Sequence, residues 1–118
     1  MKNLTELINV QKDLGLLTDY KVFNEEDRRT KEWKDAYREA CDKETLLIEK
    51  VNQNPEESKV RKSVLKAIQC IDRLKYLEKF SAISNSQEKK LLCKILEELY
   101  EDTRVISLVS RARIFRIR

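Results

Sequence analysis

The sequence predicts an all-α protein: a helical bundle of three long helices plus a short N-terminal helix, with a C-terminal segment that is helical and then extended. Tight turns and sheets use Gly and Pro often, and the 118 residues contain one of each. Apolar residues recur every three or four positions along most of the chain, which is the spacing of one helix face. With 41% hydrophobic and 39% charged residues, we expect a single helical domain over 1–118.

The first helix is expected over 3–15, where the leucines and the isoleucine fall close to one face. Asn3 suits the N-cap, and Glu6 stands at the capping-box position. Gly15 suits the left-handed residue that follows a helix end. The connection over 16–23, "LLTDYKVF", has no helical phase, and we expect it to pack onto the bundle.

Two long helices are expected next. The second begins at Asn24 with "NEED", whose acidic side chains favour the positive end of the helix dipole. We expect it to bend or cross the surface at 42–45, "DKET", where its apolar stripe is interrupted. Asn54 is a suitable N-cap for the third helix, which begins at Pro55 and is expected to run to about residue 80.

The fourth helix follows the break "SAISNSQE" over 81–88 and is expected to end near Arg111. Two pairs are alternatives for a capping box at its start: Ser84 with Gln87, or Asn85 with Glu88. From Val105 onward β-branched side chains are frequent, and these favour a strand. We therefore expect the chain beyond Arg111 to be extended or frayed.

The aromatic and cysteine side chains are expected to lie mostly in the core. The aromatic residues concerned follow helical patterns and are Trp33, Tyr37, Tyr76 and Tyr100. The three cysteines are far apart in sequence and show no Cys-x-x-Cys spacing: Cys41, Cys70 and Cys93. This pattern indicates reduced, buried thiols rather than a disulfide framework.

The composition excludes several kinds of chemistry. The chain has no histidine, which excludes Ser–His–Asp triads, Cys–His nucleophile pairs and Cys–His zinc sites. The one glycine, Gly15, cannot form a glycine-rich phosphate loop. Paired carboxylates such as Glu97 and Glu101 have lysines or apolar residues around them, and we interpret them as solvated faces. We predict no catalytic residue, no cofactor and no metal, and hence no enzyme.

Charge is distributed unevenly along the chain. Residues 1–58 contain 10 Lys or Arg and 14 Asp or Glu, a net charge of −4, whereas 59–118 contain 15 and 7, a net charge of +8. This split indicates that the basic half engages nucleic acid or an acidic partner. The predicted contact residues are Lys59, Arg61, Lys62 and Lys66 on the third helix, and Arg104, Arg111, Arg113, Arg116 and Arg118 toward the C-terminus.

The final segment, "RARIFRIR", admits three interpretations. In the first interpretation, the segment packs onto the connection over 16–23 and its arginines face water. In the second, the arginines bind nucleic-acid phosphates, because a planar guanidinium can bind a phosphate through two N–H donors. In the third interpretation it docks on a protein partner or begins a further domain, and the apolar side chains Ile114, Phe115 and Ile117 make the contact. The highly charged second helix either faces solvent or forms an interaction surface. In the second case Trp33 is a further candidate docking anchor.

The stretch over 91–112, "LLCKILEELYEDTRVISLVSRA", resembles the last helix of the helical domain in GINS replication subunits. In both, an apolar helix is followed by an arginine and then by an Ile/Leu stripe that ends in alanine. Arg104, Leu108 and Ala112 match this pattern, and Ser107 stands where that family tends to have lysine. The resemblance implies a small helical subunit of a larger complex.

These observations together predict a non-catalytic adaptor or assembly subunit that acts by surface contacts. The alternative is a purely protein-binding accessory or inhibitor module. The segment "MKNLTELINVQKDLG" lacks the apolar core of a signal peptide, and no apolar run approaches the roughly 20 residues of a membrane span. We therefore expect an intracellular protein, in the cytoplasm or in the nucleus or nucleoid. We expect a protein partner, consider nucleic acid and self-association open, and expect no membrane partner.

Overall fold

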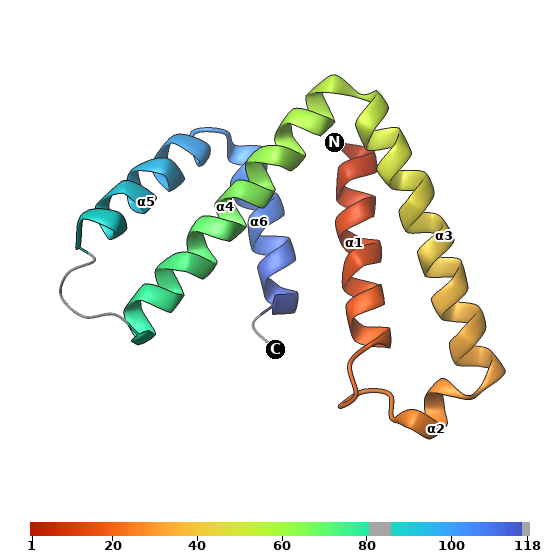
Figure 1. Cartoon of the computed structure of the whole chain (residues 1–118). Helices are drawn as coiled ribbons and strands as arrows, with labels where there is room; N and C mark the ends of the chain where they lie inside the picture. The colour runs from red at the N-terminus through yellow and green to blue at the C-terminus, as the bar shows by residue number, and fades with distance from the viewer. Residues whose placement is uncertain (81–85, 117–118) are drawn as a thin grey trace.

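The computed structural model describes the backbone of residues 1–80 and 86–116, and the side chains of 1–79 and 86–112. Within these ranges the fold is all-α, without a strand, as predicted. Six helices are present in the described ranges where four were predicted. They are α1 (Lys2–Leu17), α2 (Glu25–Arg28), α3 (Lys31–Gln53), α4 (Pro55–Phe80), α5 (Ser86–Leu99) and α6 (Thr103–Arg116) (Figure 1).

The helices form two arms that meet at the α3–α4 turn (Figure 1). One arm is the antiparallel pair of α1 and α3, which α2 connects at its far end. The other arm is the hairpin of α4 and α5. Helix α6 returns to the centre and packs against both α4 and α1. This helix therefore joins the two arms.

The core lies where α1, α3, α4 and α6 meet. Amphipathic helices gain most of their stability by burying one face in this way. All four helices contribute buried apolar side chains to this cluster, among them Leu4 and Leu7 of α1, Val51 of α3, Val60 and Val64 of α4, and Val105 and Val109 of α6. The apolar stripes predicted for these helices accordingly converge on one core.

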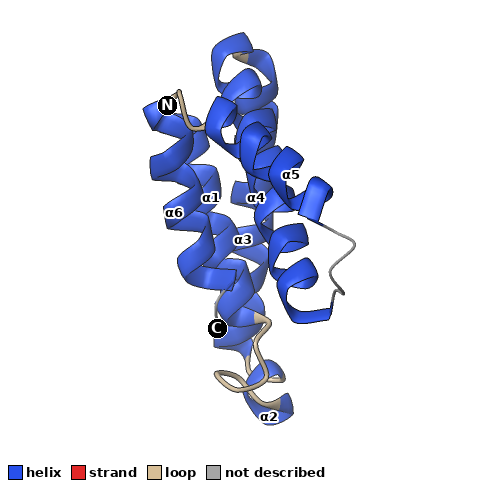
Figure 2. Ribbon diagram, turned by 90° about the vertical axis from the view of Figure 1, so that its left-hand side faces the viewer, coloured by secondary structure: helices blue, strands red, loops and turns tan. Residues whose placement is uncertain are grey.

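The molecule is flat and open rather than a compact bundle. Its dimensions are 51 × 35 × 17 Å, and Figure 2 shows its narrower side. The radius of gyration is 17.0 Å, whereas a compact domain of this length has about 13.5 Å. Its accessible surface of 8490 Å² exceeds by about 1,800 Å² the area expected for a compact protein of this mass. The open shape leaves apolar surface available for contacts.

Helix α1 is longer than predicted and begins differently. Its N-cap residue is Met1 and makes no side-chain cap, so the prediction that Asn3 caps this helix is wrong. A carboxylate from another helix replaces that cap, since Glu57 accepts a hydrogen bond from the Leu4 N–H. Gly15 lies inside the helix, and no described residue has a positive φ. Leu17 ends the helix two residues further on.

The predicted second helix is divided into α2 and α3. Asn24 begins α2 with a capping box, in which its side chain accepts from the Asp27 N–H and the Asp27 side chain accepts from the Asn24 N–H. Thr30 then caps α3 by accepting from the Trp33 N–H. A second capping residue so close to the first restarts the helix after one turn. Helix α3 continues through 42–45, and the side chains there are mostly exposed, as the surface-crossing alternative predicted.

Helix α4 has the predicted bounds, and the Asn54 side chain caps it by accepting from the N–H groups of Glu56 and Glu57. The predicted fourth helix is divided into α5 and α6 by a turn at 100–102. The Asp102 carboxylate accepts from the Arg104 N–H and so begins α6.

Helix α6 continues to Arg116, so the expectation of an extended segment beyond Arg111 is wrong over 112–116. Burial of Val105 and Val109 in the core outweighs their local β preference. The capping candidates Ser84 and Asn85 lie outside the described residues.

Several side chains assigned to the core are exposed. Tyr37 and Tyr76 are exposed, whereas Trp33 and Tyr100 are half-buried. Of the three free thiols, Cys70 is buried as predicted, Cys41 is half-buried and Cys93 is exposed. A flat fold two helices deep cannot cover every apolar position. Within the described ranges, every helix is too short or too polar to cross a bilayer.

Candidate docking cleft and basic face

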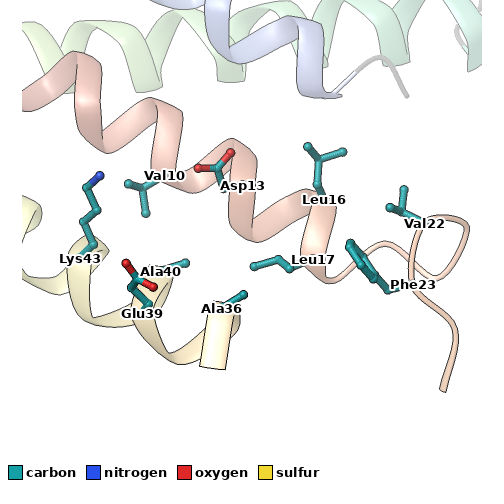
Figure 3. Close-up of a pocket in the computed structure, with 10 residues that line it drawn as sticks. All are labelled: Val10, Asp13, Leu16, Leu17, Val22, Phe23, Ala36, Glu39, Ala40 and Lys43. Carbon is teal, nitrogen blue, oxygen red and sulfur yellow. The ribbon is translucent and has the colours of Figure 1, made fainter. Parts of the chain in front are cut away.

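An open cleft of about 490 Å³ lies between α1 and α3, toward the end of the arm that carries α2 (Figure 3). Its lining is mostly apolar, with three charged side chains at the rim. The apolar residues are Val10, Leu16, Leu17, Val22, Phe23, Ala36 and Ala40, and the charged ones are Asp13, Glu39 and Lys43. Apolar concavities with a few convergent polar groups are typical of binding sites.

A second hollow of about 360 Å³ continues this cleft toward α2. The two hollows share lining residues from α1, the connection and α3: Leu17, Val22, Phe23 and Ala36. The second one adds Trp33 together with the carboxylates of Asp27 and Glu32. They form one groove along this arm, which we call the α1–α3 groove.

The connection over 18–24 that closes one end of the groove is held by side chains of α2 and α3. The Arg28 guanidinium donates to the carbonyl oxygens of Thr18, at 2.6 Å, and Phe23, at 3.2 Å. The Trp33 indole N–H donates to the Leu17 carbonyl oxygen at 2.9 Å. These bonds satisfy backbone groups that no helix satisfies. These hydrogen bonds hold the connection in a defined conformation at the end of the groove.

A line of aromatic rings and one guanidinium runs beside the groove. The Arg28 guanidinium lies 3.8 Å from the centroid of the Tyr20 ring and 5.6 Å from that of Trp33. Trp33 stacks on Tyr37 with centroids 5.1 Å apart and planes inclined by 8°. Such cation–π and stacked contacts order the participating side chains. A hydrogen bond with the Cys41 side chain raises the pKa of Tyr37 above its ordinary value.

Trp33, which was predicted to be a docking anchor, does lie at the groove. It is half-buried, and its N–H group bonds to the backbone, so it shapes the wall of the groove. The more exposed apolar side chains there are Tyr20, 67% exposed, and Val22, 49% exposed. Both were missed because they belong to the connection that was expected to pack down. The only sequence signal for them was the apolar character of "LLTDYKVF".

Carboxylates outnumber cations along the groove. Asp13 and Glu39 flank the first hollow together with Lys43, and Glu32 lies at the second. Asp27 is already engaged in the capping box of α2. The groove therefore presents an apolar floor with an acidic rim, which complements a segment carrying Lys or Arg beside apolar side chains.

Three of the four basic residues predicted on the third helix share a face of α4. Lys59, Lys62 and Lys66 are spaced by three and four residues and are all exposed. Arg61 precedes Lys62 by one position, so it points about 100° away from it around the helix axis. Arg61 is also half-buried. The basic face of α4 thus consists of Lys59, Lys62 and Lys66.

Arg104 is held by two carboxylates. Its Nη1 lies 2.7 Å from Glu56 Oε1, and its Nη2 lies 2.9 Å from Asp102 Oδ2. Hydrogen bonds to Asp102 and then to Glu56 raise the pKa of Arg104, and the hydrogen bond from Arg104 lowers the pKa of Asp102. The structure thus gives Arg104 a role at the start of α6, where it connects to α4.

The remaining predicted contact residues are close to the C-terminus. Arg111 is exposed, and its Nη1 donates to Asn9 Oδ1 at 3.4 Å, which places it beside α1. The backbone of α6 includes four further residues whose side chains lie outside the described ones: Arg113, Ile114, Phe115 and Arg116. Ile117 and Arg118 lie outside the described residues altogether.

No family model, curated protein or solved structure matches the chain. The stretch over 91–112 that resembles one helix of GINS subunits forms two helices here, because the turn at 100–102 divides it. Among the described side chains, no three His, Cys, Asp or Glu residues gather in a way that would hold a metal ion.

Proposed function

We propose that this chain is a non-catalytic adaptor or assembly subunit that acts by surface contacts, and that the α1–α3 groove receives a segment of a partner protein. The observation that carries this proposal is the groove formed around the connection over 18–24, which Arg28 and Trp33 hold in place. A site that is already ordered loses little conformational entropy on binding. The excess surface of the open fold supports a role in contacts.

The groove favours one chemical class of partner segment. Its apolar floor matches the face of an amphipathic helix, with anchors spaced by three and four residues. The rim carboxylates Asp13, Glu39 and Glu32 favour lysine or arginine beside those anchors. We therefore propose an amphipathic, basic peptide segment as the ligand.

Selection of displayed helical peptides on the full chain tests this proposal. We expect the recovered peptides to combine spaced apolar anchors with basic flanks. Ala36 lines both hollows, so Ala36→Trp should fill the groove and weaken binding by at least about tenfold. Lys34→Trp is the matched control, because Lys34 is exposed on the same helix and lines neither hollow. The proposal fails if the peptides bind Ala36→Trp as tightly as the parent chain.

The rim charges provide a second, independent variant. Glu39→Lys reverses a carboxylate at the groove without removing apolar surface. We expect it to weaken the basic peptides and to flatten the salt dependence of their binding. Recovery of acidic peptides, or equal affinity for Glu39→Lys, would contradict the assignment of a basic partner segment.

A second candidate function is the binding of nucleic-acid phosphates by the basic face of α4. The observation that favours it is the stripe of three exposed lysines, none of which forms a salt bridge among the described residues. Phosphate binding releases counterions, so affinity should fall steeply as salt rises. Insertion of an apolar peptide into the groove should respond much less to salt.

Fluorescence anisotropy of labelled single- and double-stranded DNA and RNA, at low and then physiological salt, tests the second candidate. Replacing Lys59, Lys62 and Lys66 together by Ala should remove most of the affinity. Replacing Lys12, Lys21 and Lys34 in the other arm is the matched control, because it changes the net charge equally. A variant with Ala at Arg111, Arg113, Arg116 and Arg118 tests the predicted terminal contacts. Absence of binding at low salt would reject this second function.

A further inference from the structure

Helix α5 is incompletely covered. None of its 14 residues is buried, although its apolar residues follow a helical stripe and pack against α4. Leu91 is 59% exposed, and Leu92, Ile95, Leu96 and Leu99 are only half-buried. A short helix depends on tertiary burial for most of its stability. One flank of α5 therefore remains available for a contact outside the monomer.

An ion pair joins this flank to α4. Arg73 Nε lies 2.9 Å from Glu88 Oε1, and the same guanidinium lies 5.1 Å from the centroid of the Tyr76 ring. Glu88 precedes Leu91 by three residues, so both project from the same side of α5. Tyr76 is 52% exposed. The exposed Tyr76 and Leu91 thus belong to one face of the α4–α5 hairpin, which we call the hairpin face.

The exposed charges of α5 reverse along its length. Lys90 and Lys94 occupy its first part, whereas Glu97 and Glu98 occupy its last part, and all four are exposed. Such a helix is self-complementary when two copies run antiparallel, because each basic half then faces an acidic half. In a parallel pair, like charges would face each other, which is unfavourable. A two-fold axis produces the antiparallel arrangement.

We propose that a second copy of this chain covers the hairpin face, with the two α5 helices antiparallel about a two-fold axis that passes near Lys94 and Ile95. Lys90 and Lys94 of each copy then face Glu98 and Glu97 of the other, and the exposed Leu91 and Tyr76 side chains enter the interface. The reversal of exposed charge along α5 is the observation that favours a second copy as the occupant of this face.

Sedimentation velocity of the full chain over a concentration series tests this assignment. We expect a monomer–dimer equilibrium that weakens at high salt. The double variant Lys90→Glu/Lys94→Glu should weaken the dimer by at least about tenfold, and so should Glu97→Lys/Glu98→Lys. An equimolar mixture of the two variants should form a heterodimer, since one then carries four glutamates and the other four lysines at these positions.

The fully exchanged variant makes the test specific for orientation. With Lys90→Glu, Lys94→Glu, Glu97→Lys and Glu98→Lys together, each copy again complements itself in the antiparallel arrangement. We expect this variant to dimerise with itself but not with the parent chain. Because the four side chains are exposed, circular dichroism should show parent-like helicity in all these variants. If the exchanged variant pairs with the parent, the antiparallel arrangement is wrong.

An apolar variant separates this interface from the groove. Leu91→Asp should weaken dimerisation, whereas Leu46→Asp, at an exposed leucine of α3, should leave it unchanged. Neither residue lines the α1–α3 groove, so peptide binding there should persist in both. A parent chain that stays monomeric throughout the series, or a dimer insensitive to the charge reversals, would overturn the proposal.

Discussion

Glu57 Oε2 accepts a hydrogen bond from the backbone N–H of Leu4 at 2.9 Å, and this bond joins the first turn of α4 to the first turn of α1. Glu57 is 4% exposed, and its other carboxylate oxygen lies 3.8 Å from the amino group of Met1. Both helices direct the positive end of their dipole toward this carboxylate. No described buried side-chain nitrogen or oxygen lacks a hydrogen-bond partner. Glu57 thus links the two arms where they meet, in addition to the core contacts that α6 makes with both.

Removing this carboxylate should destabilise the fold. Glu57→Ala leaves the Leu4 N–H without its acceptor in a buried position, and we expect a loss of about 1–3 kcal/mol in the free energy of unfolding. Urea denaturation, monitored by circular dichroism, measures this loss in the free energy of unfolding. Glu56→Ala is the matched control, because that neighbouring side chain is 67% exposed and its pair with Arg104 contributes little. Equal losses in the two variants would contradict the role given to Glu57.

Two adjacent leucines of α3 provide a test of the core. Leu47 is 3% exposed and Leu46 is 52% exposed. Leu47→Ala should lower the free energy of unfolding by about 2–5 kcal/mol, because it leaves a cavity between packed helices. Leu46→Ala should change it by less than about 0.5 kcal/mol. Thermal or urea unfolding of the two variants checks the prediction, and a reversed order would mean that α3 is rotated about its axis.

The connection over 18–24 should depend on Arg28. Arg28→Ala removes the donors to the carbonyl oxygens of Thr18 and Phe23, so the connection should open more often. We expect the Phe23 N–H, which donates to the Asp19 carbonyl, to exchange with solvent at least about tenfold faster. Hydrogen exchange, monitored by NMR, measures this rate. Arg29→Ala is the control, since Arg29 is exposed and follows Arg28 directly.

The same variant has an optical readout. Trp33 is the one tryptophan of the chain, and it lies beside Arg28. We expect its fluorescence emission to move to longer wavelength in Arg28→Ala, because the ring gains contact with water. An unchanged emission spectrum together with unchanged exchange would show that the connection is held by its apolar contacts alone.

The pair of Arg104 and Asp102 should be visible in a pH titration. The hydrogen bond from Arg104 lowers the pKa of Asp102 in the folded protein. The ionised pair therefore stabilises the fold above the ordinary aspartate pKa of about 3.9, and this contribution is lost as pH falls through the lower folded value. Carboxyl ¹³C NMR should show the Asp102 pKa rising in Arg104→Gln. A normal Asp102 pKa in the parent chain would mean that this pair does not persist in solution.

Local sequence features predicted those parts of the fold that depend on neighbours in the chain. The all-α class followed from the period of the apolar residues, and the bounds of α4 followed from Asn54 and Pro55. The prediction for the start of α1 was wrong because a distant side chain, Glu57, replaced the expected cap of Asn3. The predicted end was also wrong, since Gly15 lies inside the helix. The predicted fourth helix became two helices because the chain must turn back at 100–102 for α6 to reach the core.

The candidate site was predicted only in fragments. Trp33 was predicted to be a docking anchor, and the groove beside it arises from side chains of α1, the connection and α3, which are separated in sequence. The lysines of α4 could be placed on one face by spacing alone. Arg104 is bound by Glu56, which lies 48 positions earlier in the chain. Sequence spacing could not predict this contact.

The sequence by itself determined the helical class, the charge asymmetry and the chemistry that the absence of histidine excludes, because these depend on composition and on local periodicity. The tertiary structure alone decided that the helices form two open arms, that a groove lies between α1 and α3, and that α5 keeps an uncovered flank. The physical reason is that an amphipathic pattern specifies which face a helix buries but not which element covers it. That choice depends on contacts between residues far apart in the chain.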